Sequence, residues 1–252
     1  MLVDPLFYTV AIPAVILLGL AKGGFSGLGL AGVPLMALAV SPVQAASILL
    51  PILIVQDAVS VWAFRRTWDR RALAVTLPGA VAGIALGYAL AAYVSTAAVE
   101  LAVGLISMIF ALQRLWTARR PLAPVSHAPA WFGLACGAAA GFTSQIAHAG
   151  GPPFHIFLLP RRLDRDVFVG TSALFFAVVN WIKVPAYAAL GQFTSENLLA
   201  GAVLAPLAVA STWAGVLLVR RVSGARFYTL IYVLLVLVGA KLVFDGASGL
   251  AA

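Results

Sequence analysis

The feature that most constrains the fold of this chain is a series of long apolar runs. A helix needs about 20 residues to cross roughly 30 Å of hydrocarbon, and a chain in lipid must satisfy its own backbone polar groups. Runs that approach or reach this length are Val43–Phe64, Ala72–Val94, Val99–Leu115, Val167–Ala189, Leu198–Val219 and Phe227–Phe244. We therefore expect an all-α, polytopic bundle of transmembrane helices.

Composition argues against a water-soluble fold. Hydrophobic residues make up 63% of the chain and charged residues only 10%, whereas a soluble domain carries roughly a quarter charged residues. The basic residues form short clusters between apolar runs and no basic, aromatic-rich module, so we expect a lipid bilayer and no nucleic acid as partner. The oligomeric state stays open, with a homodimer as one option.

Positive charge is distributed unevenly, which predicts orientation. All Lys and Arg except Lys22, Lys183 and Lys241 fall into clusters between apolar runs. The clusters are Arg65–Arg71, Arg114–Arg120, Arg161–Arg165 and Arg220–Arg226. By the positive-inside rule, these clusters face the cytoplasm and both termini lie on the outer side of the cytoplasmic (inner) membrane.

Two further apolar regions are interrupted by glycine and polar residues. Leu6–Val40 is broken at Ala21–Gly27. Trp131–Leu159 is broken at Thr143–Gln145 and again at His148–Pro153. Each region predicts a pair of short helices joined by irregular backbone, as in a re-entrant hairpin.

The chain divides into two similar halves, 1–120 and 121–252, which together form one membrane domain. The charge pattern places Asp4 outside, Arg119 inside and Asp245 outside, so we expect each half to make an odd number of crossings and the halves to have opposite orientations. We expect each half to contain a broken hairpin and three longer spans. Gly24-Phe25-Ser26 parallels Gly141-Phe142-Thr143, and Gln56 roughly aligns with Asn180. This pattern predicts inverted repeats, an architecture of secondary transporters. The alternative is chance similarity between glycine-rich segments.

The glycine-rich segments Gly19–Pro34 and Ala140–Pro153 resemble those of the sulfite exporter TauE/SafE family of membrane permeases. The resemblance extends over about Leu6–Phe244. It implies a secondary transporter of small anions such as sulfite, sulfonates or other organic anions, in a family whose members differ in substrate and direction. The second half departs from a plain glycine run at Gln145, His148 and the double proline.

Irregular backbone at membrane depth must line a cavity or be buried in protein. Freed N–H groups at a half-helix start favour an anion, glycines allow its close approach, and hydroxyls can donate to it. The candidate substrate-binding residues at the breaks are Gly23, Gly24, Ser26, Gly27, Thr143, Ser144, Gly150 and Gly151. The alternative is that these small residues allow tight helix packing.

Charged and polar residues within the apolar regions complete the candidate site. Lys22 would hold the anion as a point charge, or would snorkel at the cytoplasmic surface. His148 could donate to the anion or carry a coupled proton, or could be structural. His155 is expected to be helix-lining or structural.

The long spans add three further candidates. Asp57 could pair with Lys22, act as the coupling carboxylate, or pair with an arginine. Asn180 could bind substrate or tie helices together. Lys183, near the outer part of its span, could rim the outward vestibule or snorkel.

These residues favour transport of small anions by alternating access, as a proton-coupled carrier or an electrogenic uniporter. The alternatives are a passive anion channel, a membrane assembly subunit without transport activity, and cation transport through Asp57. The sequence has no zinc-protease motif, no Cys/His metal-ligand spacing and no P-loop, so we expect no enzyme activity, no cofactor and no metal site.

Overall fold

A computed structural model describes residues 5–25, 27–91, 93–117, 128–219 and 225–251, and all regular structure in these residues is helical. The helices are α1 (Pro5–Lys22), η1 (Leu28–Ala31), α2 (Gly32–Met36), α3 (Pro42–Phe64), α4 (Arg70–Ala91), α5 (Thr96–Thr117), α6 (Ala130–Ala147), α7 (Gly151–Leu158), η2 (Leu159–Arg161), α8 (Arg165–Ala189), α9 (Ser195–Leu218) and α10 (Ala225–Ala251). The predicted all-α fold is confirmed.

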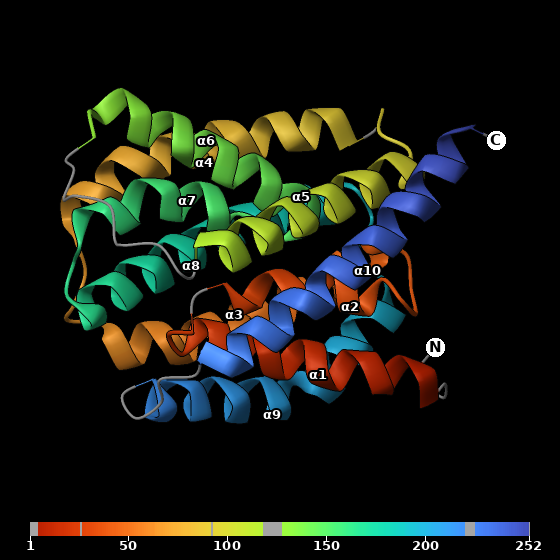
Figure 1. The fold of residues 1–252 in the computed structure, drawn as a ribbon, viewed down its shortest axis with the longest axis horizontal. Helices are drawn as coiled ribbons and strands as arrows, with labels where there is room; N and C mark the ends of the chain where they lie inside the picture. Colours follow the sequence, from red (N-terminus) through yellow and green to blue (C-terminus); the bar gives the residue numbers. More distant parts are fainter. Residues whose placement is uncertain (1–4, 26, 92, 118–127, 220–224, 252) are drawn as a thin grey trace.

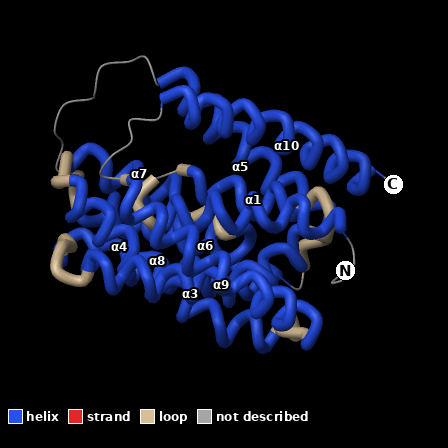
Figure 2. The backbone as a smooth tube through the Cα atoms, turned by 90° about the horizontal axis from the view of Figure 1, so that it is seen from below, coloured by secondary structure: helices blue, strands red, loops and turns tan. Residues whose placement is uncertain are grey.

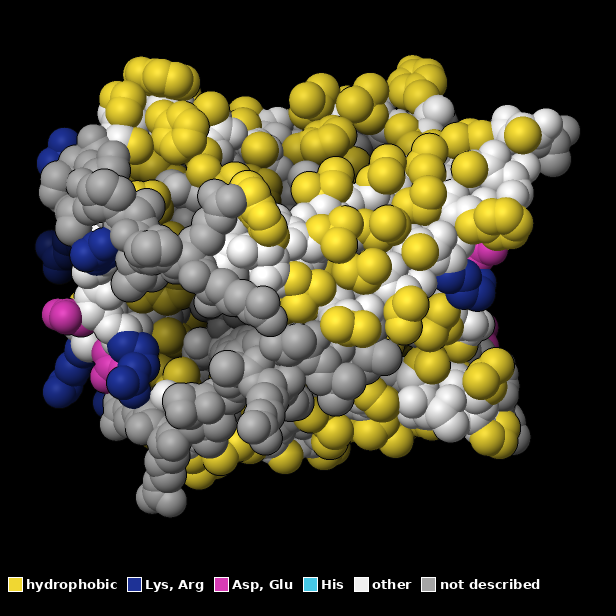
Figure 3. Space-filling model, in the orientation of Figure 1, with side chains coloured by type: hydrophobic (Ala, Val, Ile, Leu, Met, Phe, Trp, Pro, Cys, Tyr) yellow, Lys and Arg dark blue, Asp and Glu magenta, His cyan; other side chains and the backbone are white. Residues whose placement is uncertain are grey.

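Several helices of the bundle have the length and the apolar composition of a membrane span. Within the described residues, α1, α3, α4, α5, α8 and α9 are long and apolar enough to cross a bilayer. The long helices run along one common axis (Figure 1), and hydrophobic side chains predominate among the described residues on the visible flank between the two ends (Figure 3). The protein is therefore a polytopic transmembrane helix bundle.

The two ends of the bundle differ in their content of basic residues. Lys and Arg gather at the left end in Figure 3, where α3 ends and α4 and α8 begin in Figure 1. Both α1 and α10 have their terminal ends at the opposite, right-hand side of Figure 1. Arg119, Arg120, Arg220 and Arg221 lie outside the described residues. This grouping agrees with the spacing of the arginine clusters, and the side of the membrane that each end faces stays a prediction.

Local capping sets where the long spans begin. Ser41 caps α3 by accepting a hydrogen bond from the Gln44 N–H at 3.2 Å, and Pro42 occupies the first turn, where its missing N–H costs nothing. Thr194 caps α9 in the same way through the Asn197 N–H. These caps end the connections and start new crossings at fixed residues.

The first break interrupts the chain after Lys22, where Gly24 and Gly27 adopt φ values of 128° and 98°. Such positive φ angles favour glycine, because a Cβ would be strained there. The chain then turns back through η1 and α2 toward the end where α1 begins (Figure 1). This segment is the first re-entrant hairpin.

The second break is shorter than the sequence predicts. The helix α6 continues through Thr143–Gln145 and ends at Ala147, and His148 takes a left-handed conformation with φ 51°. Thr143 remains helical because its hydroxyl donates to the Ala139 carbonyl at 2.8 Å, a common bond of threonine within a helix. The predicted interruption at Thr143–Gln145 is thus wrong, whereas the one beginning at His148 is confirmed. The parallel between the two glycine-rich segments does not extend to the local structure that is described, since Gly24 lies in the first break whereas Gly141 and Thr143 lie within α6.

The two hairpins occupy the bundle from opposite ends. The hairpin of α1 and α2 opens at the right of Figure 1, and the hairpin of α6 and α7 opens at the left. The helix α4 packs along α6, α9 along α1, and α3 against both α8 and α9. The helices α5 and α10 pack on each other at one edge of the bundle (Figure 2).

Small residues bring these helices into close contact. A Cβ added at Gly83 of α4 would overlap the Ala138 carbonyl of α6, and one at Gly137 of α6 would overlap the Thr76 carbonyl of α4. Small residues at such crossings are typical of membrane helix pairs. The α4–α6 contact holds the second broken helix rigidly against a long span.

Candidate functional site

Both breaks line one cavity inside the bundle. The cavity encloses about 100 Å³, several times the space that one water molecule requires. The first break contributes Lys22, Gly24 and Gly27 to its wall, and the second contributes Ser144, His148 and Gly151. The two interrupted helices, far apart in sequence, therefore meet at a space large enough for a small ion.

Lys22 forms an ion pair with Asp57 of α3. Asn180 of α8 donates its amide N–H to the other oxygen of the same carboxylate at 2.6 Å. Asp57 thus joins α1, α3 and α8, and its partner is Lys22 and not an arginine. The Lys22 side chain is 12% exposed and lines the cavity. Its ammonium has three N–H groups, so donors remain for a ligand.

Lys183 lies at the second break and is fully buried, with 0% exposure. Its Nζ lies 3.1 Å from both the carbonyl and the hydroxyl oxygen of Ser144, and 2.6 Å from Nδ1 of His148. The three ammonium donors of the lysine therefore each have an acceptor. The predicted positions at an outward rim or snorkelling at the interface are both wrong, because α8 turns this residue toward α6.

The imidazole of His148 is held on both sides. Nδ1 lies 2.6 Å from Lys183 Nζ, and Nε2 lies 2.8 Å from the Ala46 carbonyl of α3. In the tautomer in which Nδ1 accepts from Lys183, the proton of the neutral ring lies on Nε2 and donates to Ala46. The ring also stacks on Tyr187, with 6.0 Å between the ring centroids. His148 can donate to a ligand only if it releases Ala46.

Several predicted site residues support the break and do not line the cavity. A Cβ at Gly23 would lie 2.5 Å from the Gly215 Cα of α9, so Gly23 serves helix packing. Thr143 donates to the Ala149 carbonyl at 3.1 Å and thereby closes the turn. Gly150 packs against Ala140 and Phe176. Ser26 lies outside the described residues.

Sequence reasoning also missed one cavity residue. His155 of α7 is buried with 6% exposure and lines the same cavity. A histidine on an apolar helix is not distinctive, so no local pattern identifies this position.

The charges of the site do not balance. In the described interior around the breaks, the positive side chains Lys22 and Lys183 face Asp57 as the acidic group. An excess cation at membrane depth is costly unless it faces a partner or a cavity.

A second cavity lies beyond His148, toward the end of the bundle away from the arginines. It encloses about 260 Å³ and is lined by residues from the start of α3, the end of α4 and the loop after α8. Ala46, Gln145 and Tyr187 belong to its wall, whereas His148 belongs to the wall of the first cavity. The hydrogen bond between His148 and the Ala46 carbonyl therefore connects the walls of the two cavities.

Comparison with known proteins supports one assignment. The family model described as sulfite exporter TauE/SafE matches residues 11–242, nearly the whole chain. Searches of curated proteins and of solved structures gave no match. Because the family match spans both hairpins and the long helices that surround the cavity, this chain belongs to the sulfite exporter TauE/SafE family of membrane transporters.

Proposed function

We propose that this protein is a secondary transporter that moves small anions, such as sulfite, sulfonates or other organic anions, across the cytoplasmic membrane by alternating access. The observation that carries the proposal is the cavity between the two breaks, which has two lysines and one aspartate around it. The arginine-rich end would face the cytoplasm, and both termini would lie outside.

Donors around the first cavity fit an oxyanion. Lys22 retains ammonium protons beyond the one directed at Asp57. The Ser144 hydroxyl accepts from Lys183, which leaves its own hydrogen free to donate. Gly151 is the first residue of α7, so its N–H has no partner within that helix. A lysine that acts through a hydroxyl polarises it, which strengthens a hydrogen bond to an anion.

The His148–Ala46 contact supports alternating access over a continuous pore. In the described structure the Nε2–H of His148 closes on the Ala46 carbonyl between the two cavities. An anion in the first cavity would compete with Ala46 for this proton. Release of the Ala46 carbonyl would then loosen α3 from the end of α6 and connect the first cavity with the second.

Helix packing supports two inverted repeats, 1–120 and 121–252, as the moving parts. If α1 corresponds to α6 and α4 to α9, exchange of the halves turns the α4–α6 contact into the α9–α1 contact. Both contacts are present, and each joins a broken helix to a long span. Both contacts join one half to the other, so rocking of the halves would pivot at these contacts and change the His148–Ala46 contact.

Transport can be tested with purified protein in liposomes. We expect saturable exchange of sulfite between the two sides, and we expect sulfite or sulfonates to raise the melting temperature of the solubilised protein. Ion conductance without saturable counterflow would favour a channel. If no anion binds and none is transported, the proposed function is wrong.

A further inference from the structure

The start of α7 is poorly equipped to bind an anion through its backbone. A helix N-terminus normally presents several free N–H groups. Here the first helical residue, Gly151, is followed by Pro152 and Pro153, and proline has no N–H. Two of the amides that would otherwise face the cavity are therefore missing. A ligand at this end of the cavity needs a donor from a side chain.

His155 is placed to supply it. It lies four residues after Gly151, so both occupy the same face of α7, and both line the cavity. The nearest atom outside the local helix backbone to a Cβ added at Gly151 is Cε1 of His155, 4.0 Å away. The side chain is therefore beside the helix start that the prolines leave short of donors.

Nδ1 of this histidine is buried and has no hydrogen-bond partner among the described residues. The ring lies between aromatic neighbours, with centroid distances of 5.9 Å to Phe154 and 5.3 Å to Phe168. Neither phenylalanine can accept or donate in place of water. Leaving a buried polar atom unpaired costs free energy, and such an atom in a native structure calls for an explanation.

We propose that His155 is a substrate-binding, specificity-determining residue that hydrogen-bonds an oxygen atom of an oxyanion at the start of α7. This inference rests on the proposed anion transport and assigns a recognition role within it. The Gly151 N–H and the His155 side chain together replace the backbone N–H donors that Pro152 and Pro153 lack. A directional donor favours ligands with localised oxygen acceptors over spherical halides.

The test compares His155→Phe with Ser172→Ala. Phenylalanine suits the aromatic surroundings but removes both ring nitrogens. Ser172 lines the same cavity, yet its hydroxyl already donates to the Phe168 carbonyl at 2.9 Å, so its loss removes no donor from the ligand. Sulfite and bromide binding would be measured by calorimetry on solubilised protein, with the melting temperature without ligand as a check of folding.

We expect His155→Phe to weaken sulfite binding about tenfold, the effect of one hydrogen bond to a charged group, and to change bromide binding little. Ser172→Ala should bind both ions as the unaltered protein does. His155→Gln, which restores a donor, should recover part of the sulfite affinity and also serves if the phenylalanine variant does not fold.

Two results separate the levels of the proposal. If the unaltered protein binds sulfite and a folded His155 variant binds it equally well, the role of His155 is wrong while anion transport stands. An equal loss for sulfite and bromide would indicate a structural role and would also overturn the inference. Absence of anion binding by the unaltered protein would remove the proposed function itself.

Discussion

The two breaks solve the same physical problem with different residues. In each, a helix ends inside the bundle with carbonyl groups that have no partner within that helix. At the first break, Ser60 of α3 donates to the Lys22 carbonyl at 2.7 Å. At the second, Lys183 of α8 donates to the Ser144 carbonyl and Tyr187 to the Gln145 carbonyl. In both cases the long helix that follows the hairpin provides the donors.

The charge left behind differs between the breaks. Lys22 is matched by Asp57, so the first break is close to neutral. Lys183 has neutral acceptors in Ser144 and His148 and no ion-pair partner among the described residues. Under the proposed function the breaks have separate tasks: the first opens the backbone with glycines, and the second would attract the anion and carries the His148 contact to α3.

The largest expected effect comes from breaking the neutral pair. Asp57→Asn or Lys22→Met alone leaves one uncompensated charge at membrane depth, which should lower stability by about 3–5 kcal/mol. The double variant removes both charges and should regain much of this loss. Denaturation of the solubilised proteins measures these changes in the free energy of unfolding. Equal stability of all three variants and the unaltered protein would show that the pair is not a buried unit.

The same variants should change anion binding in opposite directions. Asp57→Asn raises the excess positive charge and should strengthen sulfite binding, whereas Lys22→Met cancels that excess and should weaken it. Titration of the folded fraction with sulfite measures both. A weaker binding in both variants would contradict the charge argument and favour Asp57 as a ligand or coupling group.

The next effect tests the second break. Lys183→Met keeps the length of the side chain but removes its charge and the donors to Ser144 and His148. We expect sulfite affinity to fall about a hundredfold, which corresponds to about 2.7 kcal/mol. Lys241→Met is the matched control, because Lys241 pairs with Asp245 on an exposed face. Retained affinity in the Lys183 variant would transfer the anion site to the first break.

The hydrophobic pattern of the sequence predicts where the long helices lie but not where each helix ends. Apolar runs locate the spans closely: Val43–Phe64 was expected and Pro42–Phe64 is observed. The pattern fails at Thr143–Gln145, because polar residues can satisfy their hydroxyls on the preceding helical turn. Polarity alone therefore does not show whether a helix ends.

The site is only partly predictable because it depends on which helix faces meet. Lys22 and His148 were found because they interrupt apolar segments. The sequence does not show that Lys183 is buried, because its surroundings depend on the face of α8 that turns toward Ser144 and His148. The role of His155 depends on an unpaired nitrogen and on two neighbouring prolines, which only the assembled cavity brings together.

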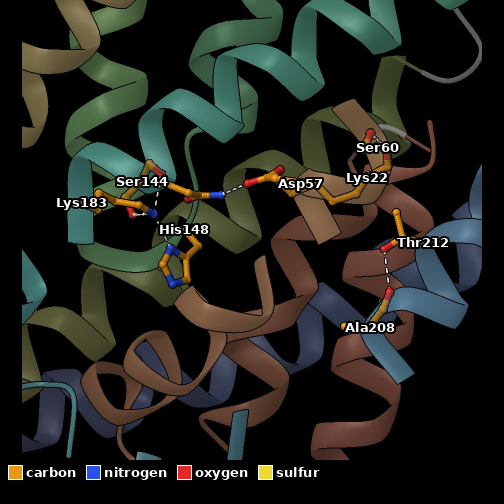
Figure 4. Close-up of polar contacts among 9 residues, drawn as sticks. Lys22, Asp57, Ser60, Ser144, His148, Lys183, Ala208 and Thr212 are labelled. Atoms are coloured by element: carbon orange, nitrogen blue, oxygen red, sulfur yellow. Dashed lines mark hydrogen bonds and ion pairs between the residues drawn. The ribbon is translucent and has the colours of Figure 1, made fainter. Parts of the chain in front are cut away.

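A smaller effect should follow from removing one hydroxyl at the second break. Ser144→Ala deletes the group that connects Lys183 with the cavity and should weaken sulfite binding about tenfold. Thr212→Ala removes a hydroxyl of α9 that donates to the Ala208 carbonyl (Figure 4), and it should leave binding unchanged. If both alanine variants bind sulfite equally, Lys183 does not act through Ser144.

The smallest expected effect concerns the His148–Ala46 contact between the two cavities. Anion binding at the second break should release this contact and expose position 46 to solvent. In a Cys136→Ala background, which removes the buried cysteine of the chain, we would introduce Ala46→Cys or Val94→Cys. Both positions line the second cavity, but Ala46 is buried whereas Val94 is exposed.

If an anion takes the His148 proton from the Ala46 carbonyl, sulfite should increase labelling of Ala46→Cys by a few-fold through a shift in population. Labelling of Val94→Cys by an impermeant thiol reagent should occur from the outer side with or without sulfite. Sulfite-independent labelling at position 46 would mean that anion binding at the second break is not linked to opening, and the two breaks would then differ in charge alone.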